Sequence, residues 1–175
     1  MVNLQDMCQN RGYTEIRSFE EAIESDREEL RPILACKNAQ QDVVVFKVKK
    51  LGIDTVRKLL ELEVVEGSHV ILIYETDITA FSRKYLRKCK SFSYEIHPTN
   101  FFKFNPTKHV LVPEHRKLDQ DERQTLVARV SPECFPKILS TDPISKWYCF
   151  SKGDVVEIRR ATPLGSYMKT YRYCA

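Results

Sequence analysis

The stretch DVVVFKVKKLGIDTVRKLLELEVVEGSHVILIYE (42–75) decides the fold of the first part of the chain. It opens with a nearly unbroken run of β-branched and aromatic residues over 42–48, which is typical of a strand covered on both faces. Helical spacing follows over 52–63, and a second buried-strand run covers 68–75. Parallel strands need a long crossover, usually a helix, so this order predicts a strand, helix, strand unit with parallel pairing.

Further helices and strands are expected on both sides of this stretch. Apolar residues at helical spacing predict helices, and β-branched and aromatic runs predict strands. By these criteria the helices are residues 4–13, 18–30 and 78–89, and the strands are residues 91–97 and 101–105. The segment 18–30 also opens with Ser18 and Glu21 in the capping-box pattern. We therefore predict that residues 1–105 form an α/β domain.

The sequence beyond residue 105 has shorter elements in a different order. Helices are expected over 119–130 and 141–149, an extended piece over 134–139, and two final strands over 152–160 and 166–173. Asp142 is placed to cap its helix, and Pro143 stands at the first helical position, where its missing N–H is not needed. Turn chemistry between the last two strands comes from Pro163 and Gly165. Residues 106–175 are thus predicted to form a small α+β domain with a β-hairpin.

Composition excludes several classes of protein but does not name a partner. The chain has 28 Lys and Arg against 24 Asp and Glu, and the excess lies beyond residue 105, where 12 basic residues face 8 acidic ones. The six cysteines are far apart without a C-x-x-C pair, which favours reduced thiols in an intracellular protein. No apolar run reaches the roughly 18–20 residues that span a bilayer, so we expect a soluble protein.

The heptapeptide HVLVPEH (109–115) has two histidines that invite a chemical interpretation. Zinc would need two further ligands, and no cysteine or histidine lies at the spacing that usually supplies them. An acid/base pair of Glu114 and His115 is also disfavoured, because neighbouring residues on a strand point to opposite faces. The stretch is best interpreted as structural or as part of an interface.

A nuclease is the alternative from the enzyme class. Magnesium-dependent nucleases of the restriction type carry an acid-x-Lys strand whose carboxylate binds the metal. The comparable strand here offers Asp42, then Lys47 and Lys49, and the middle carboxylate is absent. These positions therefore cannot complete a metal cage.

Two basic groups support a second alternative, a free-standing DNA-binding protein. The first group lies on one helix and its exit and consists of Arg83, Lys84, Arg87, Lys88 and Lys90. Phosphate contact is one interpretation and a solvated helix surface is the other. The second group, Arg159, Arg160 and Arg172, stands among tyrosines, a combination that also suits a protein docking face.

Four C-terminal motifs closely resemble the assembly domain of the common fifth subunit of the eukaryotic nuclear RNA polymerases, which is related to a small archaeal polymerase subunit. They are HVLVPEH (109–115), FPKILSTDPISKWY (135–148), KGDVVEIRR (152–160) and GSYMKTYR (165–172). A looser similarity covers MCQNRGY (7–13), KKLGIDTV (49–56) and the exit of the first domain at 101–115. In that family the first domain is a jaw, built like a nuclease without its catalytic carboxylates.

The resemblance implies a non-catalytic subunit of a DNA-dependent RNA polymerase, without cofactor or metal of its own. It would be one copy within a hetero-oligomer, docked on the largest subunit near other subunits, with the jaw facing downstream DNA. The residues implied in docking are His109, Pro113, His115, Pro136, Asp142, Pro143, Gly153, Val155, Arg160, Tyr171 and Arg172. Candidates for contact with DNA or a partner are Arg83, Arg87 and Lys90.

Departures from the family pattern lead to further expectations. The chain is shorter before residue 42, which implies a trimmed jaw and suggests a copy encoded by a large DNA virus. We expect localisation in the nucleus, or in the virion and host cytoplasm if a virus encodes the chain. In the last hairpin, Arg160 to Gly165 is one residue tighter than the family's spacing and Tyr167 to Tyr171 is one residue longer, which predicts a β-bulge. Within HVLVPEH, Leu111 is expected to pack inward and Pro113 to shape the exit.

Overall fold

The computed structural model describes residues 2–18, 31–37, 42–62, 67–88, 92–163 and 165–175. The chain divides into two compact units, Met1–Phe104 and Asn105–Ala175, and each is described by itself. Both units combine helices with a sheet, as the sequence predicts. In the part of the chain described, no helix has the length and apolar character needed to cross a membrane.

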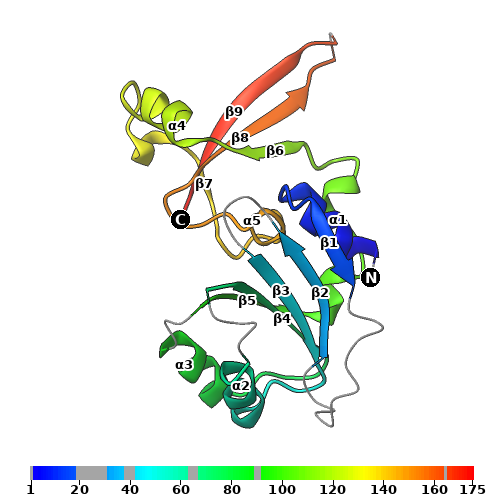
Figure 1. Ribbon diagram of the computed structural model, residues 1–175. Coiled ribbons are helices and arrows are strands. Elements are labelled where there is room, and N and C mark those ends of the chain that lie inside the picture. The colour runs from blue at the N-terminus through cyan, green and yellow to red at the C-terminus, as the bar shows by residue number, and fades with distance from the viewer. Residues whose placement is uncertain (1, 19–30, 38–41, 63–66, 89–91, 164) are drawn as a thin grey trace. The chain divides into compact units, whose positions relative to one another are not determined.

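The N-terminal unit is built on a five-stranded sheet in the order β1, β2, β3, β4, β5 (Figure 1). These strands are Glu15–Ser18, Arg31–Lys37, Asp42–Val48, His69–Tyr74 and Ser93–Pro98. The predicted parallel pairing of β3 with β4 is present, and β5 pairs with β4 in parallel as well. Two strands that the sequence analysis missed, β1 and β2, extend the sheet in antiparallel fashion.

Helices cover both faces of this sheet. On one face, α2 (Ile53–Leu60) and α3 (Ala80–Lys88) pack against a core of Phe46, Leu72 and their neighbours. The third helix, α1 (Val2–Asn10), buries Leu4, Met7 and Cys8. The Cys8 thiol forms a hydrogen bond with the side chain of Cys36 on β2. Burial on both faces explains why β3 and β4 read as continuous apolar runs.

The C-terminal unit contains a four-stranded sheet in the order β6, β8, β9, β7. These strands are Glu114–Lys117, Val155–Ala161, Tyr167–Cys174 and Lys137–Ile138. Its core joins Val156 and Ile158 of β8 to Cys174 of β9 and to Ile144 of α5 (Pro143–Tyr148). Three further elements are α4 (Gln120–Val127) and the 3-10 turns η3 (Pro106–Lys108) and η4 (Pro132–Cys134).

Local sequence signals account for both C-terminal helices. Asp119 caps α4 and Glu122 closes the box, since each side chain accepts a hydrogen bond from the other residue's backbone N–H. The Asp142 carboxylate accepts from the backbone N–H of Ile144, and Pro143 begins α5 as predicted. The same helix ends at Cys149, which adopts the left-handed conformation.

Three local predictions are wrong. Residues 101–105 do not form a strand, because the chain turns through the 3-10 helix η2 (Thr99–Phe102), with Phe101 stacked on His97. The β8–β9 hairpin has no bulge, since its register is continuous from Val155 opposite Tyr173 to Ala161 opposite Tyr167. Leu111 is exposed rather than packed inward. Most of the helix predicted over 18–30 lies outside the described residues, and Ser18 ends β1.

Candidate subunit interface

One face of the C-terminal sheet carries a charged cluster around His115. This residue lies on β6, and its Nδ1 donates to the backbone carbonyl of Pro113 at 2.7 Å. Burial lowers the pKa of His115; the bond to Pro113 and the Asp142 carboxylate oppose this shift. The guanidinium groups of Arg172 and Arg160 lower that pKa further. Three further residues implied in docking and drawn from separate motifs, Asp142, Arg160 and Arg172, therefore lie close enough to His115 to affect its pKa.

The chain enters this sheet through a turn that exposes two aliphatic side chains. The backbone N–H of Val112 donates to the carbonyl of His109, and the N–H of Leu111 donates to His109 Nδ1. Val110 is 93% exposed and Leu111 is 81% exposed, whereas Val112 packs on the core. The expectation for Leu111 is thus wrong by one residue, because the turn rather than a strand decides which side chain points inward.

The remaining docking candidates have different surroundings. Pro136 and Pro143 are exposed, and Tyr171 packs edge-on against Phe135 with ring centroids 6.3 Å apart. Gly153 has a φ of 99°, which favours glycine, and Val155 is 1% exposed. Any contribution of Val155 to docking would therefore be indirect, through the fold of the sheet.

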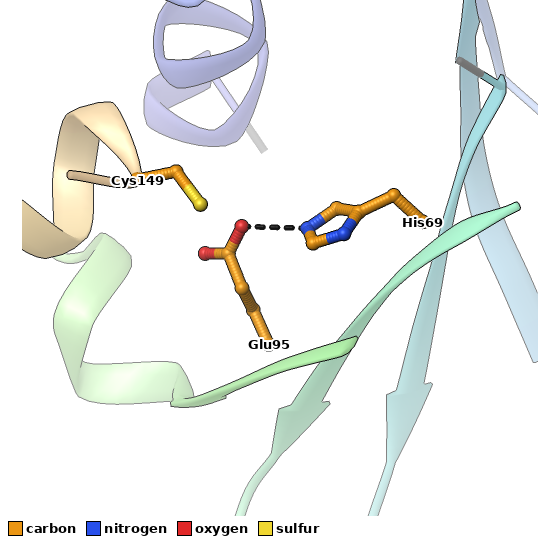
Figure 2. A group of neighbouring side chains, drawn as sticks. All are labelled: His69, Glu95 and Cys149. Carbon is orange, nitrogen blue, oxygen red and sulfur yellow. Dashed lines mark hydrogen bonds and ion pairs between the residues drawn. The ribbon is translucent and has the colours of Figure 1, made fainter. Parts of the chain in front are cut away.

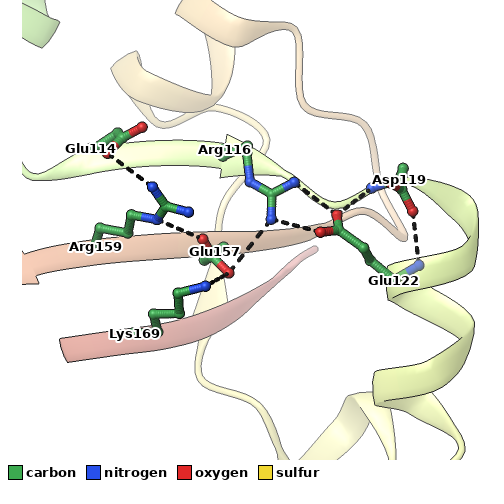
Figure 3. Close-up of polar contacts among 7 residues, drawn as sticks. All are labelled: Glu114, Arg116, Asp119, Glu122, Glu157, Arg159 and Lys169. Atoms are coloured by element: carbon green, nitrogen blue, oxygen red, sulfur yellow. Dashed lines mark hydrogen bonds and ion pairs between the residues drawn. The ribbon is translucent and has the colours of Figure 1, made fainter. Parts of the chain in front are cut away.

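The opposite face of the C-terminal sheet holds a buried carboxylate that the sequence did not reveal (Figure 3). The Glu157 side chain is 3% exposed and contacts Arg159 Nε at 2.9 Å, Lys169 Nζ at 3.3 Å and Arg116 Nη2 at 3.5 Å. Arg116 also forms a bidentate ion pair with the Glu122 carboxylate. Burial opposes ionisation of Glu157, but the hydrogen bonds from Arg159 and Lys169 outweigh it and lower its pKa. The network ties β6, β8, β9 and α4 together.

A cleft of 480 Å³ lies beside this network, between α4 and the sheet. Leu118, Leu126 and Tyr171 supply apolar surface, while Arg129 and Asp121 supply charge at its walls. The lining is mixed in polarity and charge. No substrate class follows from it.

The N-terminal unit contains a second carboxylate network around Glu95 on β5, whose side chain is 13% exposed. Arg11 Nη1 and Nη2 donate to its two oxygens at 2.8 and 2.9 Å. His69 points toward one carboxylate oxygen (Figure 2), and its Nε2 lies 2.7 Å from that oxygen, while His97 Nε2 lies 2.8 Å from the other. Burial disfavours the charged form, but the bonds from the two histidines and from Arg11 hold the pKa of Glu95 well below its usual range.

Sequence reasoning missed this network because its members lie far apart along the chain. His69 and Glu95 stand on neighbouring parallel strands, and Arg11 comes just after α1. The available signal was the pair of polar residues Glu95 and His97, which stand at alternate positions of one predicted strand and therefore share a face. Predicting their partner required the placement of α1.

The basic helix α3 exposes the residues that the sequence assigned to DNA or a partner. Arg83 and Arg87 are exposed, as are Lys84 and Lys88, while Leu86 faces the core. Lys90 lies outside the described residues. The cationic surface continues onto α2, where Arg57 is exposed and lies 4.0 Å from Asp54.

Comparison with known proteins identifies the relatives of this chain. The family model described as RNA polymerase Rpb5, C-terminal domain, matches residues 104–174. "DNA-directed RNA polymerase subunit Rpo5" of Pyrococcus abyssi is 41% identical over 71 residues, which cover 39% of this chain and 87% of the archaeal protein. The chain belongs to the Rpb5 family of RNA polymerase subunits. It is therefore a non-catalytic subunit of a DNA-directed RNA polymerase, as the resemblance implied.

Similarity to Rpb5 relatives extends beyond the C-terminal unit. Rpo5 of Methanothermobacter thermautotrophicus is 40% identical over 67 residues, which cover 37% of this chain and 87% of that protein. "DNA-directed RNA polymerases I, II, and III subunit rpabc1" of Dictyostelium discoideum is 28% identical over 131 residues, covering 71% of this chain and 66% of that protein. Because 71% of the chain exceeds the C-terminal unit, this similarity reaches into the N-terminal unit as well.

Proposed function

We propose that this Rpb5-family chain docks on the largest polymerase subunit through its C-terminal unit, and that its N-terminal unit supports the jaw around downstream DNA. The functional division would lie between residues 1–105 and 106–175. The proposal assigns docking to the surface that contains the His115 cluster and the exposed turn at 109–112. Other polymerase subunits would contact the same chain as neighbours in the complex.

The exposed turn is the observation that carries the docking proposal. Val110 and Leu111 are adjacent, strongly exposed aliphatic residues on a turn fixed by two hydrogen bonds. Burying one such side chain contributes about 1.5–3 kcal/mol. A preformed apolar turn suits insertion into a partner, because little conformational entropy is lost on binding.

Leu111→Asp tests the docking surface without disturbing the core. We expect a tagged variant to recover at least about tenfold less of the catalytic polymerase subunits, because a carboxylate would be buried against the partner. Unfolding of the isolated chain should be unchanged, since the wild-type side chain is exposed. Val2→Asp, at another exposed aliphatic residue, is the matched control. Wild-type recovery with Leu111→Asp would remove the turn from the interface.

For the N-terminal unit we propose contact between α3 and the phosphates of downstream DNA. Four exposed cations on one short helix, Arg83, Lys84, Arg87 and Lys88, form the basic surface. Such contacts are sequence-independent and weaken as salt rises, because bound phosphates release counterions. This surface supports a free-standing DNA-binding function only if the isolated chain binds duplex DNA at physiological salt.

Charge reversal on α3 tests the DNA contact in the assembled enzyme. Polymerase carrying Arg83→Glu and Arg87→Glu should bind downstream duplex about tenfold more weakly at low salt, with a shallower dependence of affinity on salt. Lys103→Glu changes an exposed charge of the same unit outside α3 and serves as the control. An unchanged salt dependence in the double variant would assign α3 to another role.

The nuclease-like character of the jaw remains part of the proposal. Two of the three positions considered for metal chemistry form exposed ion pairs. Lys47 lies 2.7 Å from Glu75, and Asp42 lies 3.8 Å from Lys37. These pairs support a jaw without a hydrolytic metal site. We further propose that the chain acts in the nucleus of a eukaryotic cell, or in the virion and host cytoplasm if a virus encodes it.

A further inference from the structure

The last strand of the C-terminal sheet has an outer edge that is largely unpaired within the described residues. Strand β9 runs over eight residues, but β7 pairs only with its end, Lys137 opposite Tyr173 and Ile138 opposite Cys174. On the other side of the sheet, β6 stops opposite Arg159. The far part of the β8–β9 hairpin extends past both neighbours (Figure 1).

The ladder determines which backbone groups of β9 point to this edge. The N–H of Cys174 donates inward to Asp154, and the N–H of Tyr173 donates outward to Pro136. Because successive N–H groups of a strand alternate in direction, the even-numbered residues of β9 bond to β8 and the odd-numbered ones face away. Tyr167, Lys169 and Tyr171 therefore present their N–H and C=O groups outward. Among the described residues, none forms a backbone hydrogen bond with these outward groups.

Side chains around this edge are apolar and cationic. Tyr167 is 74% exposed and Met168 is 50% exposed. The hairpin carries one acid, Glu157, and four cations, Arg159, Arg160, Lys169 and Arg172. Glu157 already forms ion pairs with Arg159 and Lys169. Arg160 and Arg172 lie on the same face as Met168, whereas Glu157 lies on the other. An exposed strand edge with unpaired backbone groups is a template for another strand.

We propose that the outer edge of β9 takes up an extended segment of another polymerase subunit as an added strand, with an acidic side chain of that segment placed beside Arg172 on the Met168 face. This rests on the proposed function, because the occupant is a subunit of the same enzyme. Main-chain bonds to Tyr167, Lys169 and Tyr171 would give the affinity, and the arginines would select the acidic sequence.

A second copy of this chain is the less favourable occupant. Two β9 edges paired antiparallel about the centre of the unpaired stretch 167–171 would place Lys169 opposite Lys169 and add the arginines of both hairpins to one sheet. Like charges directly opposite each other destabilise a strand pair. An acidic segment of a different chain avoids this repulsion.

Hydrogen exchange at single-residue resolution tests the proposal on the full chain, free and within purified polymerase. In the free chain the amides of Lys169 and Tyr171 should exchange fast, and those of Met168 and Thr170 slowly, because only the latter bond to β8. In the assembled enzyme the Lys169 and Tyr171 amides should slow by about tenfold or more. Fast exchange at both positions in assembled polymerase would overturn the added strand.

A pair of substitutions at Lys169 distinguishes the contribution of its main-chain N–H to binding from that of its side chain. Lys169→Pro removes an outward N–H, which an edge strand tolerates, whereas Lys169→Ala keeps it. We expect about tenfold weaker association for the proline variant relative to the alanine variant, with similar unfolding of the two free chains. Equal association would contradict the proposal. If the wild-type chain recovers no polymerase at all, the proposed function itself is wrong. Failure of the added strand, in which wild-type recovery is kept and the two variants associate equally, is therefore distinguishable from failure of the proposed function.

Discussion

Glu95→Ala should lower the free energy of unfolding of the N-terminal unit by about 3–5 kcal/mol, because it leaves the Arg11 guanidinium buried without its carboxylate. The Arg11 side chain is 4% exposed and donates hydrogen bonds to both carboxylate oxygens of Glu95. His69 and His97 lose an acceptor at the same time. Urea unfolding followed by far-UV circular dichroism measures the change.

The single tryptophan provides an internal reference for this experiment. Trp147 belongs to the C-terminal unit and is fully buried, so its fluorescence reports that unit. Glu75→Ala is the matched control, since it breaks an exposed pair with Lys47 that contributes at most about 1 kcal/mol. Equal destabilisation by Glu95→Ala and Glu75→Ala would show that the buried network does not hold the N-terminal unit together.

Val156→Asp should unfold the C-terminal unit and abolish recovery of polymerase subunits. Val156 is completely buried in the core beside Ile158 and Cys174. Burying an unpaired carboxylate there costs several kcal/mol, a large share of the stability expected for a 71-residue unit. Loss of the Trp147 transition in urea, together with loss of co-purifying catalytic subunits, is the expected result.

A substitution at the exposed end of the same strand is the control. Ala161 is exposed at the far end of β8, so Ala161→Asp introduces the same charge without burying it. The Trp147 transition should then keep the wild-type midpoint. If Val156→Asp retained both the transition and the polymerase subunits, the core described for the C-terminal unit would be wrong.

The pattern of apolar residues along the sequence correctly predicted the strands that are buried on both faces. The runs ending at Val48 and Tyr74 have apolar side chains toward both faces, and the capping residues Asp119 and Asp142 stand before helices that begin where expected. Strand β2 was missed because it joins the sheet at an antiparallel position next to a charged segment. Its pairing depends on contacts with β3 rather than on its own pattern.

The site was predicted less completely than the fold. Sequence motifs placed His115, Asp142, Arg160 and Arg172 in a docking set, and the fold brings these four into one cluster. The exposure of Leu111 could not be predicted, because it depends on a turn closed by His109. The Glu95 and Glu157 networks required the register of neighbouring strands, which a single sequence does not contain.

Cross-linking of purified polymerase tests the central claim most directly. The enzyme would be isolated from its source cells through a tag on this chain, treated with a lysine-reactive cross-linker, and mapped by mass spectrometry. Lys117, Lys137 and Lys169 are exposed on the C-terminal unit and should link to the largest subunit. Recovery of the chain without catalytic polymerase subunits, or links to the largest subunit from the N-terminal unit alone, would contradict the account.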